Sequence, residues 1–433
     1  DENGASLKYS LDFAQNIWKE RPEMSMESVF SLEDEYTGEK IGSKLERIRE
    51  VMKENGCNAH VLSSLDDIAW LLNIRGNDIA YCPLVLSYAI VYNNSVELFA
   101  DIRKFSDDII NLLAENQVKI YPYEDIYRKV SEMTSEDKLL LDSSIMNYSL
   151  YQAISKETVI VDKQNPEILM KSVKNETQAE NLRKAHLKDA VAHTKFMYWL
   201  KKNIGRVEIT ELSASARLEG LRAEQEHFLG PSFGPISAYG EHGAIVHYSA
   251  DEKSNVPLKE GKLFMTDTGG HYLEGSTDIT RTVALGEVGN IEKEHFTLVA
   301  RAMLRLANTV FLYGCSGANL DCISREVFWK EGLNFNHGTG HGVGYLLNIH
   351  EGPINFRWKE GERPAPALEE NMVITDEPGI YIEGSHGIRL ENELLVRKTV
   401  KNEYGQFMNF EILTYVPIDL DAILPEKMST EEK

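Results

Sequence analysis

Short apolar runs alternate with amphipathic stretches between residues 37 and 165, and this alternation strongly limits how the first third of the chain can fold. Residues 59–62, 118–121 and 138–141 have the length and apolar character of buried strands. Residues 41–52 repeat apolar side chains at helical spacing. Strands and helices that alternate in this way are typical of an α/β domain.

The rest of the chain has a different pattern. A long helix is expected over residues 176–202 and a second over residues 212–224, and strands with glycine-rich turns follow them. Because 433 residues are too many for one ordinary hydrophobic core, two or more domains are expected. We predict a linker or the tail of a missing first domain at residues 1–36, an α/β domain at 37–165, a linker around 163–175, and a second domain at 170–433.

Composition excludes some classes of partner. The formal charge of −22 repels phosphate backbones and anionic lipids, so we expect neither a nucleic acid nor a membrane as partner. Apolar runs are too short for a membrane-spanning helix. The four cysteines lack the spacing of a zinc finger and are too few to staple a chain of this length, which predicts free thiols and a cytoplasmic location.

Two carboxylates flank a glycine-rich turn in the second half of the chain. Asp267 ends an apolar run, and Asp278 lies at the start of the next expected strand. Carboxylates at the facing ends of a tight β-ribbon can converge on one point, and a buried carboxylate without a partner is costly, which favours a metal site. The alternative is that both are exposed turn residues, as aspartates beside glycine turns usually are.

A glycine-dense segment follows at residues 337–345. It contains two histidines four residues apart, His337 and His341, and four glycines in nine residues. That glycine density argues against a helix, so the segment is not the HExxH zinc helix, whose glutamate is also missing. It fits a backbone that approaches a ligand closely, although a flexible loop with incidental histidines would look the same.

Two acidic segments lie nearer the C-terminus. Glu377 precedes a Pro-Gly turn at the end of an expected strand. Alternation along a later strand would place Arg389, Glu391 and Glu393 on one face. An exposed strand face with salt bridges would explain this second segment as well.

Together, these segments resemble the pita-bread metallopeptidases, which include methionine aminopeptidase, prolidase and aminopeptidase P. The resemblance covers roughly residues 170 to 420 and implies an α+β chain, with a pita-bread (creatinase/aminopeptidase) catalytic domain after a smaller creatinase N-terminal-like domain. Five motifs in order are a specific signal. In order and local context, the residues that match the metal ligands of the family are Asp267, Asp278, His341, Glu377 and Glu391.

A closer resemblance is to the eukaryote-type, three-domain aminopeptidase P. It rests on Ile245-Val246-His247-Tyr248, on Asn348-Ile349-His350-Glu351-Gly352-Pro353 and on residues 65–76 of the preceding domain. It implies that the chain comprises the middle and catalytic domains, forms a homodimer and acts on peptides with proline in the second position. Methionine aminopeptidase fits less well, because an α/β domain ahead of the core is typical of the proline-specific branch.

The resemblance also implies a mechanism. Asp278 and Glu391 would bridge two divalent ions, with Asp267 on one ion and His341 and Glu377 on the other. Four carboxylates and one imidazole suit Mn²⁺, with Co²⁺, Zn²⁺ or Fe²⁺ as alternatives. A water between the ions would become a hydroxide near neutral pH and attack the peptide carbonyl.

Residues around the ligands are expected to assist. Glu377 would carry a proton to the leaving nitrogen, and Arg389 would orient a ligating carboxylate. The expected catalytic residues are His247, His350, Glu377 and Arg389, and the expected substrate contacts are His247, His337, His350 and Tyr381. Three other functions remain open: an Xaa-Pro dipeptidase (prolidase), which shares all five ligands, and a metal-free binding protein or a creatinase-like enzyme, which the intact ligand set disfavours.

Overall fold

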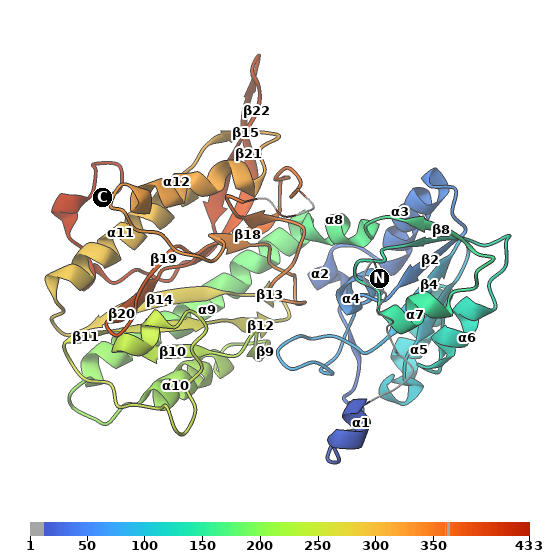
Figure 1. Cartoon of the computed structure of the whole chain (residues 1–433), viewed down its shortest axis with the longest axis horizontal. Coiled ribbons are helices and arrows are strands. Elements are labelled where there is room, and N and C mark those ends of the chain that lie inside the picture. Colours follow the sequence, from blue (N-terminus) through green and yellow to red (C-terminus); the bar gives the residue numbers. More distant parts are fainter. Residues whose placement is uncertain (1–12, 360, 362–363) are drawn as a thin grey trace, which may run out of the picture. The chain divides into compact units, whose positions relative to one another are not determined.

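The computed structural model describes residues 13–359, 361 and 364–433, and the chain forms two compact units, Asp1–Met170 and Lys171–Lys433 (Figure 1). Residues 1–12, which belong to the predicted linker or tail, lie outside the described residues. The remainder of that segment contains regular structure and belongs to the first unit. It forms α1 (Phe13–Ile17), β1 (Phe30–Ser31) and the start of α2 (Asp34–Thr37), and β1 pairs with β3 (Ile74–Arg75).

A mixed sheet of six strands forms the centre of the first unit. Its strands, in spatial order, are β6 (Val118–Tyr121), β5 (Val96–Phe99), β4 (Tyr88–Tyr92), β2 (Ala59–Leu62), β7 (Lys138–Leu141) and β8 (Val159–Asp162). The helices that alternate with these strands along the chain are α3 (Ile41–Glu54), α4 (Leu65–Leu71), α5 (Asp107–Glu115), α6 (Asp125–Ser131) and α7 (Tyr148–Ala153). Ala59 and Val61 of β2 pack in one core with Ile126 and Val130 of α6, so the predicted α/β character is confirmed.

The segment predicted as a linker around residues 163–175 contains a helix, α8 (Pro166–Ser172). The sequence did not reveal this helix, because seven residues carry little periodic signal and Pro166 resembles a helix break. Proline is, however, well suited to the first position of a helix, where its fixed φ is helical and its missing N–H is not needed.

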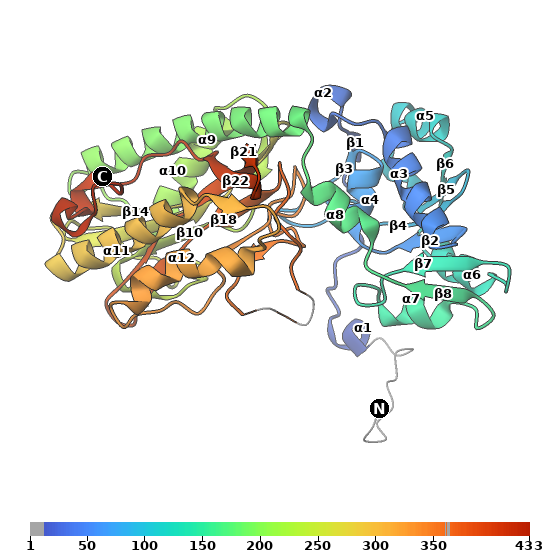
Figure 2. The ribbon, with the colours of Figure 1, turned by 90° about the horizontal axis from the view of Figure 1, so that it is seen from above.

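Two pairs of helices enclose strands in the second unit (Figure 2). One pair is α9 (Glu176–Asn203) and α10 (Glu211–Ala223), and the other is α11 (Asn290–Ala307) and α12 (Gly317–Trp329). α9 begins where the sequence predicts, because Asn175 and Gln178 form a capping box that satisfies backbone N–H groups of its first turn.

The strands between the helix pairs are buried on both faces. In the pair β11 (Lys262–Thr268) and β14 (Ile279–Leu285), Phe264 and Val283 pack against α9 and α10. Their neighbours Leu263 and Ala284 pack against α11 and α12, because successive side chains of a strand point to opposite faces. This arrangement of helices on both sides of central strands is the predicted pita-bread fold.

Besides the sheet that contains β11 and β14, four further sheets are described in the second unit. β10 (Ile236–Tyr239) extends the β11–β14 sheet. The largest of the further sheets contains, in spatial order, β15 (Phe311–Leu312), β22 (Gly405–Ile412), β21 (Asn392–Asn402) and β18 (Val373–Asp376). The remaining strands are β9 (Phe228–Pro231), β12 (Gly270–Tyr272), β13 (Gly275–Ser276), β16 (Gly340–His341), β17 (Asn355–Phe356), β19 (Gly379–Ile382) and β20 (His386–Arg389). Within the described part of the chain, no helix is long and apolar enough to cross a membrane.

Candidate metal centre

Antiparallel pairing of β11 and β14 brings two carboxylates to the same end of the sheet. Asp267, near the end of β11, pairs in register with Thr280 of β14, and Asp278 immediately precedes β14. Both aspartates are buried, with 9% and 4% of their surface exposed. The structure therefore places them inside the protein rather than on an exposed turn.

β16 and β18 place the next two candidates. Glu377 directly follows β18, and its backbone N–H donates to the Thr339 carbonyl at 2.8 Å. The Thr375 hydroxyl accepts from the His341 backbone N–H at 3.0 Å and donates to Glu377 Oε1 at 3.1 Å. Thr375 thus fixes both His341 and Glu377.

The glycines around His341 allow this close packing. A Cβ on Gly340 would lie 1.8 Å from the Thr375 carbonyl oxygen, and one on Gly342 would lie 2.2 Å from the Glu351 carbonyl oxygen. Neither position could hold a side chain without moving the backbone. The sequence predicts that the backbone of residues 337–345 approaches a ligand closely. In the structure, Gly340 and Gly342 instead allow this backbone to pack closely against neighbouring backbone.

Glu391 lies between β20 and β21, where the expected continuous strand is interrupted. Its carboxylate accepts from the Thr280 hydroxyl at 2.7 Å, and its backbone N–H donates to the Thr280 carbonyl at 3.1 Å. β14 therefore positions Glu391 opposite Asp267, since Thr280 is the register partner of Asp267.

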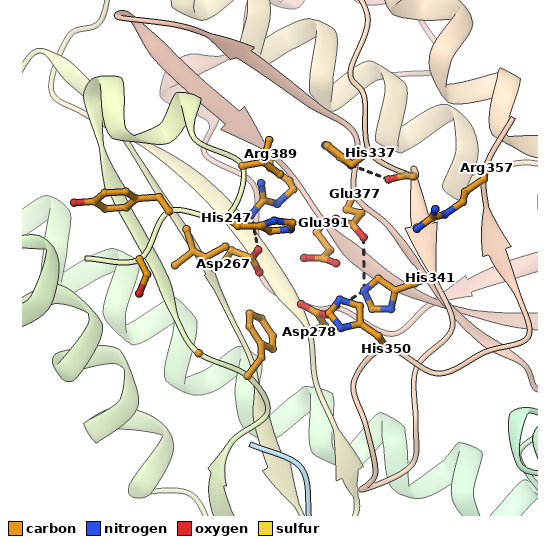
Figure 3. Close-up of a pocket in the computed structure, with 18 residues that line it drawn as sticks. His247, Asp267, Asp278, His337, His341, His350, Arg357, Glu377, Arg389 and Glu391 are labelled. Atoms are coloured by element: carbon orange, nitrogen blue, oxygen red, sulfur yellow. Dashed lines mark hydrogen bonds and ion pairs between the residues drawn. The ribbon is translucent and has the colours of Figure 1, made fainter. Parts of the chain in front are cut away.

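The five candidate ligands converge on one cavity of about 460 Å³ (Figure 3). Ligand atoms of Asp278, His341 and Glu391 all lie within 4.8 Å of one another. His341 Nε2 is 3.5 Å from Asp278 Oδ2 and 3.6 Å from Glu377 Oε1. Asp267 lines the same cavity, and its buried Oδ1 has no hydrogen-bond partner among the described residues.

Electrostatics in this cluster favour a cation. Burial raises the pKa of Asp278, Glu377 and Glu391, and repulsion from neighbouring carboxylates adds to the shift in each case. A divalent cation would remove that penalty, because it stabilises the ionised form of every ligand. Carboxylate oxygens with one imidazole nitrogen also form a donor set that divalent transition metals accept, so the residues fit a metal site.

Arg389, Tyr381 and His337 form a chain of hydrogen bonds beside the cluster. The buried Arg389 guanidinium donates to Asp267 Oδ2 and to the Tyr381 hydroxyl, the latter at 2.8 Å. His337 Nε2 is 2.9 Å from that hydroxyl. Burial raises the pKa of Tyr381 to about 12. Tyr381 is absent from the described lining of the cavity, unlike the other nine residues expected at the site.

Three histidines line the cavity around the ligands: His247, His337 and His350. The rings of His350 and His341 lie 4.2 Å apart between centroids. Desolvation at the cavity wall lowers the pKa of His350 to about 4, and also that of His337 to about 4. Both imidazoles are therefore neutral at pH 7, so each can donate from one nitrogen and accept at the other.

The cavity wall also contains residues outside the set of expected catalytic, substrate and metal residues. Phe233, Val246 and Tyr248 form an apolar part, and Arg357 lies on the side of His337 and Gly338. Val246 and Tyr248 flank His247 in the motif Ile245-Val246-His247-Tyr248, so the motif indicates their place near the site. Phe233 and Arg357 stand in segments without a recognisable motif, and only folding brings them to the site.

Glu393, expected on one face with Arg389 and Glu391, supports the cluster from behind. Its Oε1 accepts from the Asp278 backbone N–H at 2.6 Å, and its Oε2 lies 3.2 Å from His186 Nε2. Both side chains are fully buried. Glu393 thus holds the backbone of a candidate ligand rather than facing the cavity.

Two known families match the chain, and their matches correspond approximately to its two units. The creatinase/prolidase N-terminal domain matches residues 20–178. Metallopeptidase family M24 matches residues 180–398, which is half of the chain and includes all five candidate ligands. The chain belongs to metallopeptidase family M24. The predicted family and its fold are thereby confirmed.

Curated relatives of this M24 chain match along its full length. Xaa-Pro aminopeptidase 1 of Dictyostelium discoideum is 36% identical over 437 residues, which cover 100% of this chain and 69% of that protein. Aminopeptidase P1 of Arabidopsis thaliana is 33% identical over 481 residues, which cover 100% of this chain and 74% of that protein.

Solved structures show the same similarity. The X-prolyl aminopeptidase of Caenorhabditis elegans, described as a cytosolic enzyme with a di-nuclear active site, matches this M24 chain with a TM-score of 0.91 and 34% identity, over 97% of this chain and 69% of that one. The Xaa-Pro dipeptidase of Bacillus anthracis matches with a TM-score of 0.70 and 25% identity, over 89% of this chain and 100% of that one.

Proposed function

We propose that this chain is a dinuclear-metal aminopeptidase that hydrolyses the bond between an N-terminal residue and proline. The observation that carries the proposal is the convergence of four acids and one imidazole on a single cavity, in an M24 chain. The names of its relatives in Dictyostelium and Arabidopsis, and of the similar structure from Caenorhabditis elegans, support the choice of substrate.

The proposed cofactor is a pair of divalent ions, with Mn²⁺ the best match to the oxygen-rich donor set. The residues that would hold the pair are Asp267, Asp278, His341, Glu377 and Glu391. Two such ions supply Lewis acidity, which lowers the pKa of water and polarises a carbonyl. The di-nuclear site described for the Caenorhabditis elegans enzyme supports the number of ions.

The side chains around the ligands have separate roles in this proposal. His247 and His350 donate hydrogen bonds to the oxygen of the scissile carbonyl as negative charge develops there. Glu377 moves a proton from the attacking water to the leaving proline nitrogen. Arg389 orients Asp267, and Tyr381 orients Arg389 and His337.

A direct assay distinguishes this function from that of an Xaa-Pro dipeptidase. The Mn²⁺-loaded chain is incubated with the tripeptide Ala-Pro-Ala and, separately, with the dipeptide Ala-Pro. Release of alanine from the tripeptide is the expected result. Cleavage of the dipeptide alone would identify a prolidase, and cleavage of neither, with no bound metal by elemental analysis, would identify a binding protein.

The cytosolic relative and the resemblance to aminopeptidase P also suggest the setting of the enzyme. We include in the proposal a cytoplasmic location and a homodimer. Light scattering coupled to size-exclusion chromatography measures the second directly, since a monomer has a mass of 49.1 kDa.

A further inference from the structure

Arg357 stands out among the residues of the metal cavity because its charge has no partner within the described part of the chain. It lines the cavity, and its guanidinium points toward the candidate ligands (Figure 3). Among the described residues it has no hydrogen bond or ion pair, although the chain carries 68 acidic residues. By contrast, Arg389 is bonded to Asp267, and Arg325 to Asp321.

The backbone at Arg357 is held on both sides. Phe356 precedes it in β17 and is fully buried, and Trp358 follows it and packs edge-on against Trp329 with 5.8 Å between ring centroids. The Arg357 stem runs over Gly338, where an added Cβ would lie 3.1 Å from Arg357 Cγ and Nε. Gly338 thus leaves the room that this arginine occupies.

A second cavity continues from the first past Arg357. Its volume is about 350 Å³, and it shares His341, His350 and Arg357 with the first. Lys359 also lines it. A peptide that extends from the metal cluster along this path would meet positive charge, and a carboxylate there would form a charge-assisted, two-pronged hydrogen bond with the guanidinium.

Arg357 also sets the direction of a bound peptide. Repulsion between the guanidinium and the free ammonium group of an aminopeptidase substrate would place the N-terminal residue on the apolar side of the cavity, toward Phe233 and Val246. Proline and the residues that follow it then lie on the side of His337 and Arg357. A carboxylate in the residue after proline is placed where Arg357 can reach it.

Resting on the proposed aminopeptidase function, we propose that Arg357 is a specificity-determining residue that binds a substrate carboxylate located after the proline. The carboxylate is either the C-terminal group of a tripeptide or the side chain of an acidic third residue. Arg357 therefore favours short or acidic peptides, although the surface of the chain as a whole is acidic.

Four substrates separate these sources: Ala-Pro-Gly, its C-terminal amide, and the amides of Ala-Pro-Glu and Ala-Pro-Gln. For the Mn²⁺-loaded wild type, we expect kcat/KM to be about tenfold higher for Ala-Pro-Gly than for its amide, mainly through KM. A similar ratio of the glutamate to the glutamine peptide would assign the side chain as a second source. Arg357→Gln should bring the ratios close to one while hydrolysis of the neutral amide continues, and Arg357→Lys should retain part of the preference.

Two controls keep the inference separate from the proposed function. Arg217→Gln removes an exposed arginine of α10 that does not line the cavity, and it should leave the ratios unchanged. Calorimetry with the dipeptides Pro-Gly and Pro-Gly-amide measures the same preference without hydrolysis. Equal binding of the two by wild type, or a preference that survives in Arg357→Gln, would overturn the role of Arg357. Failure to cleave the neutral amide, with the binding preference intact, would overturn the aminopeptidase function instead.

Discussion

His341 and His350 face each other across 4.2 Å at the edge of the metal cluster, yet their expected roles differ. His341 lies within 3.6 Å of two candidate ligands, Asp278 and Glu377. His350 lines the cavity, but within the described structure it has no comparable contact with a ligating carboxylate. The pair therefore offers a matched test of which histidine holds metal.

We expect His341→Ala to lose both bound metal and turnover, with the fold retained. His350→Ala should keep its metal and lose about 100-fold or more in kcat, since a positioned donor at the reacting carbonyl contributes that much. Mass spectrometry of bound metal and steady-state kinetics measure the two effects. A parallel loss of metal in His350→Ala would make His350 a ligand.

Arg389 acts on Asp267 from behind the cluster. Its replacement by methionine leaves the buried Asp267 carboxylate without its counter-charge and the Tyr381 hydroxyl without its donor. We expect Arg389→Met to weaken Mn²⁺ binding or activity by about 10–100-fold, as loss of a residue that orients a ligand usually does. Tyr381→Phe, which removes only the hydroxyl, should have a smaller effect. Wild-type metal affinity together with wild-type activity in Arg389→Met would contradict the assignment.

At the level of secondary-structure elements, the close packing of β16 against β18 requires glycine at position 340. An added Cβ would lie 1.8 Å from the Thr375 carbonyl of β18, so Gly340→Ala must push the two strands apart and move His341. We expect a loss of stability of about 3 kcal/mol, typical of overpacking, and weaker metal binding. As a control, Gly220→Ala in the exposed part of α10 meets nothing within 4 Å and should stabilise the chain by roughly 0.5–1 kcal/mol. Urea unfolding measures both; an unaffected Gly340→Ala would show that the strands can separate freely.

Helices and strands whose ends are marked by local sequence signals could be predicted well. The helix expected over residues 176–202 is α9 (Glu176–Asn203), because a capping box marks its start, and the strand over residues 59–62 is β2. α8 was missed because a helix of seven residues carries little periodic signal. Most site residues that stand in motifs line the cavity, and Tyr381 is the exception. Arg357 had no local signal, since its place depends on packing between distant segments.

At the scale of the whole chain, the metal cluster links stability to pH and to metal. In the absence of metal, burial and mutual repulsion raise the pKa of Asp278, Glu377 and Glu391 above their ordinary values of 3.8, 4.5 and 4.5. The folded chain then binds more protons than the unfolded chain, so the metal-free protein loses stability as pH rises through this range and beyond. Divalent metal has the opposite effect, because it binds the ionised carboxylates of the folded state alone.

Removal of metal should therefore lower the melting temperature, and the size of the effect should depend on pH. At a free Mn²⁺ concentration of 100 times Kd, binding adds about 2.7 kcal/mol to the stability of the second unit. We expect the difference in Tm between Mn²⁺-loaded and EDTA-treated protein to be largest near pH 7.5 and to shrink as pH falls toward 5, because protons then compete with metal for the carboxylates. Differential scanning calorimetry at several pH values measures this difference, with His341→Ala as the control that should show little response to Mn²⁺. A difference in Tm that does not change with pH would mean that these carboxylates are not the groups that bind the metal.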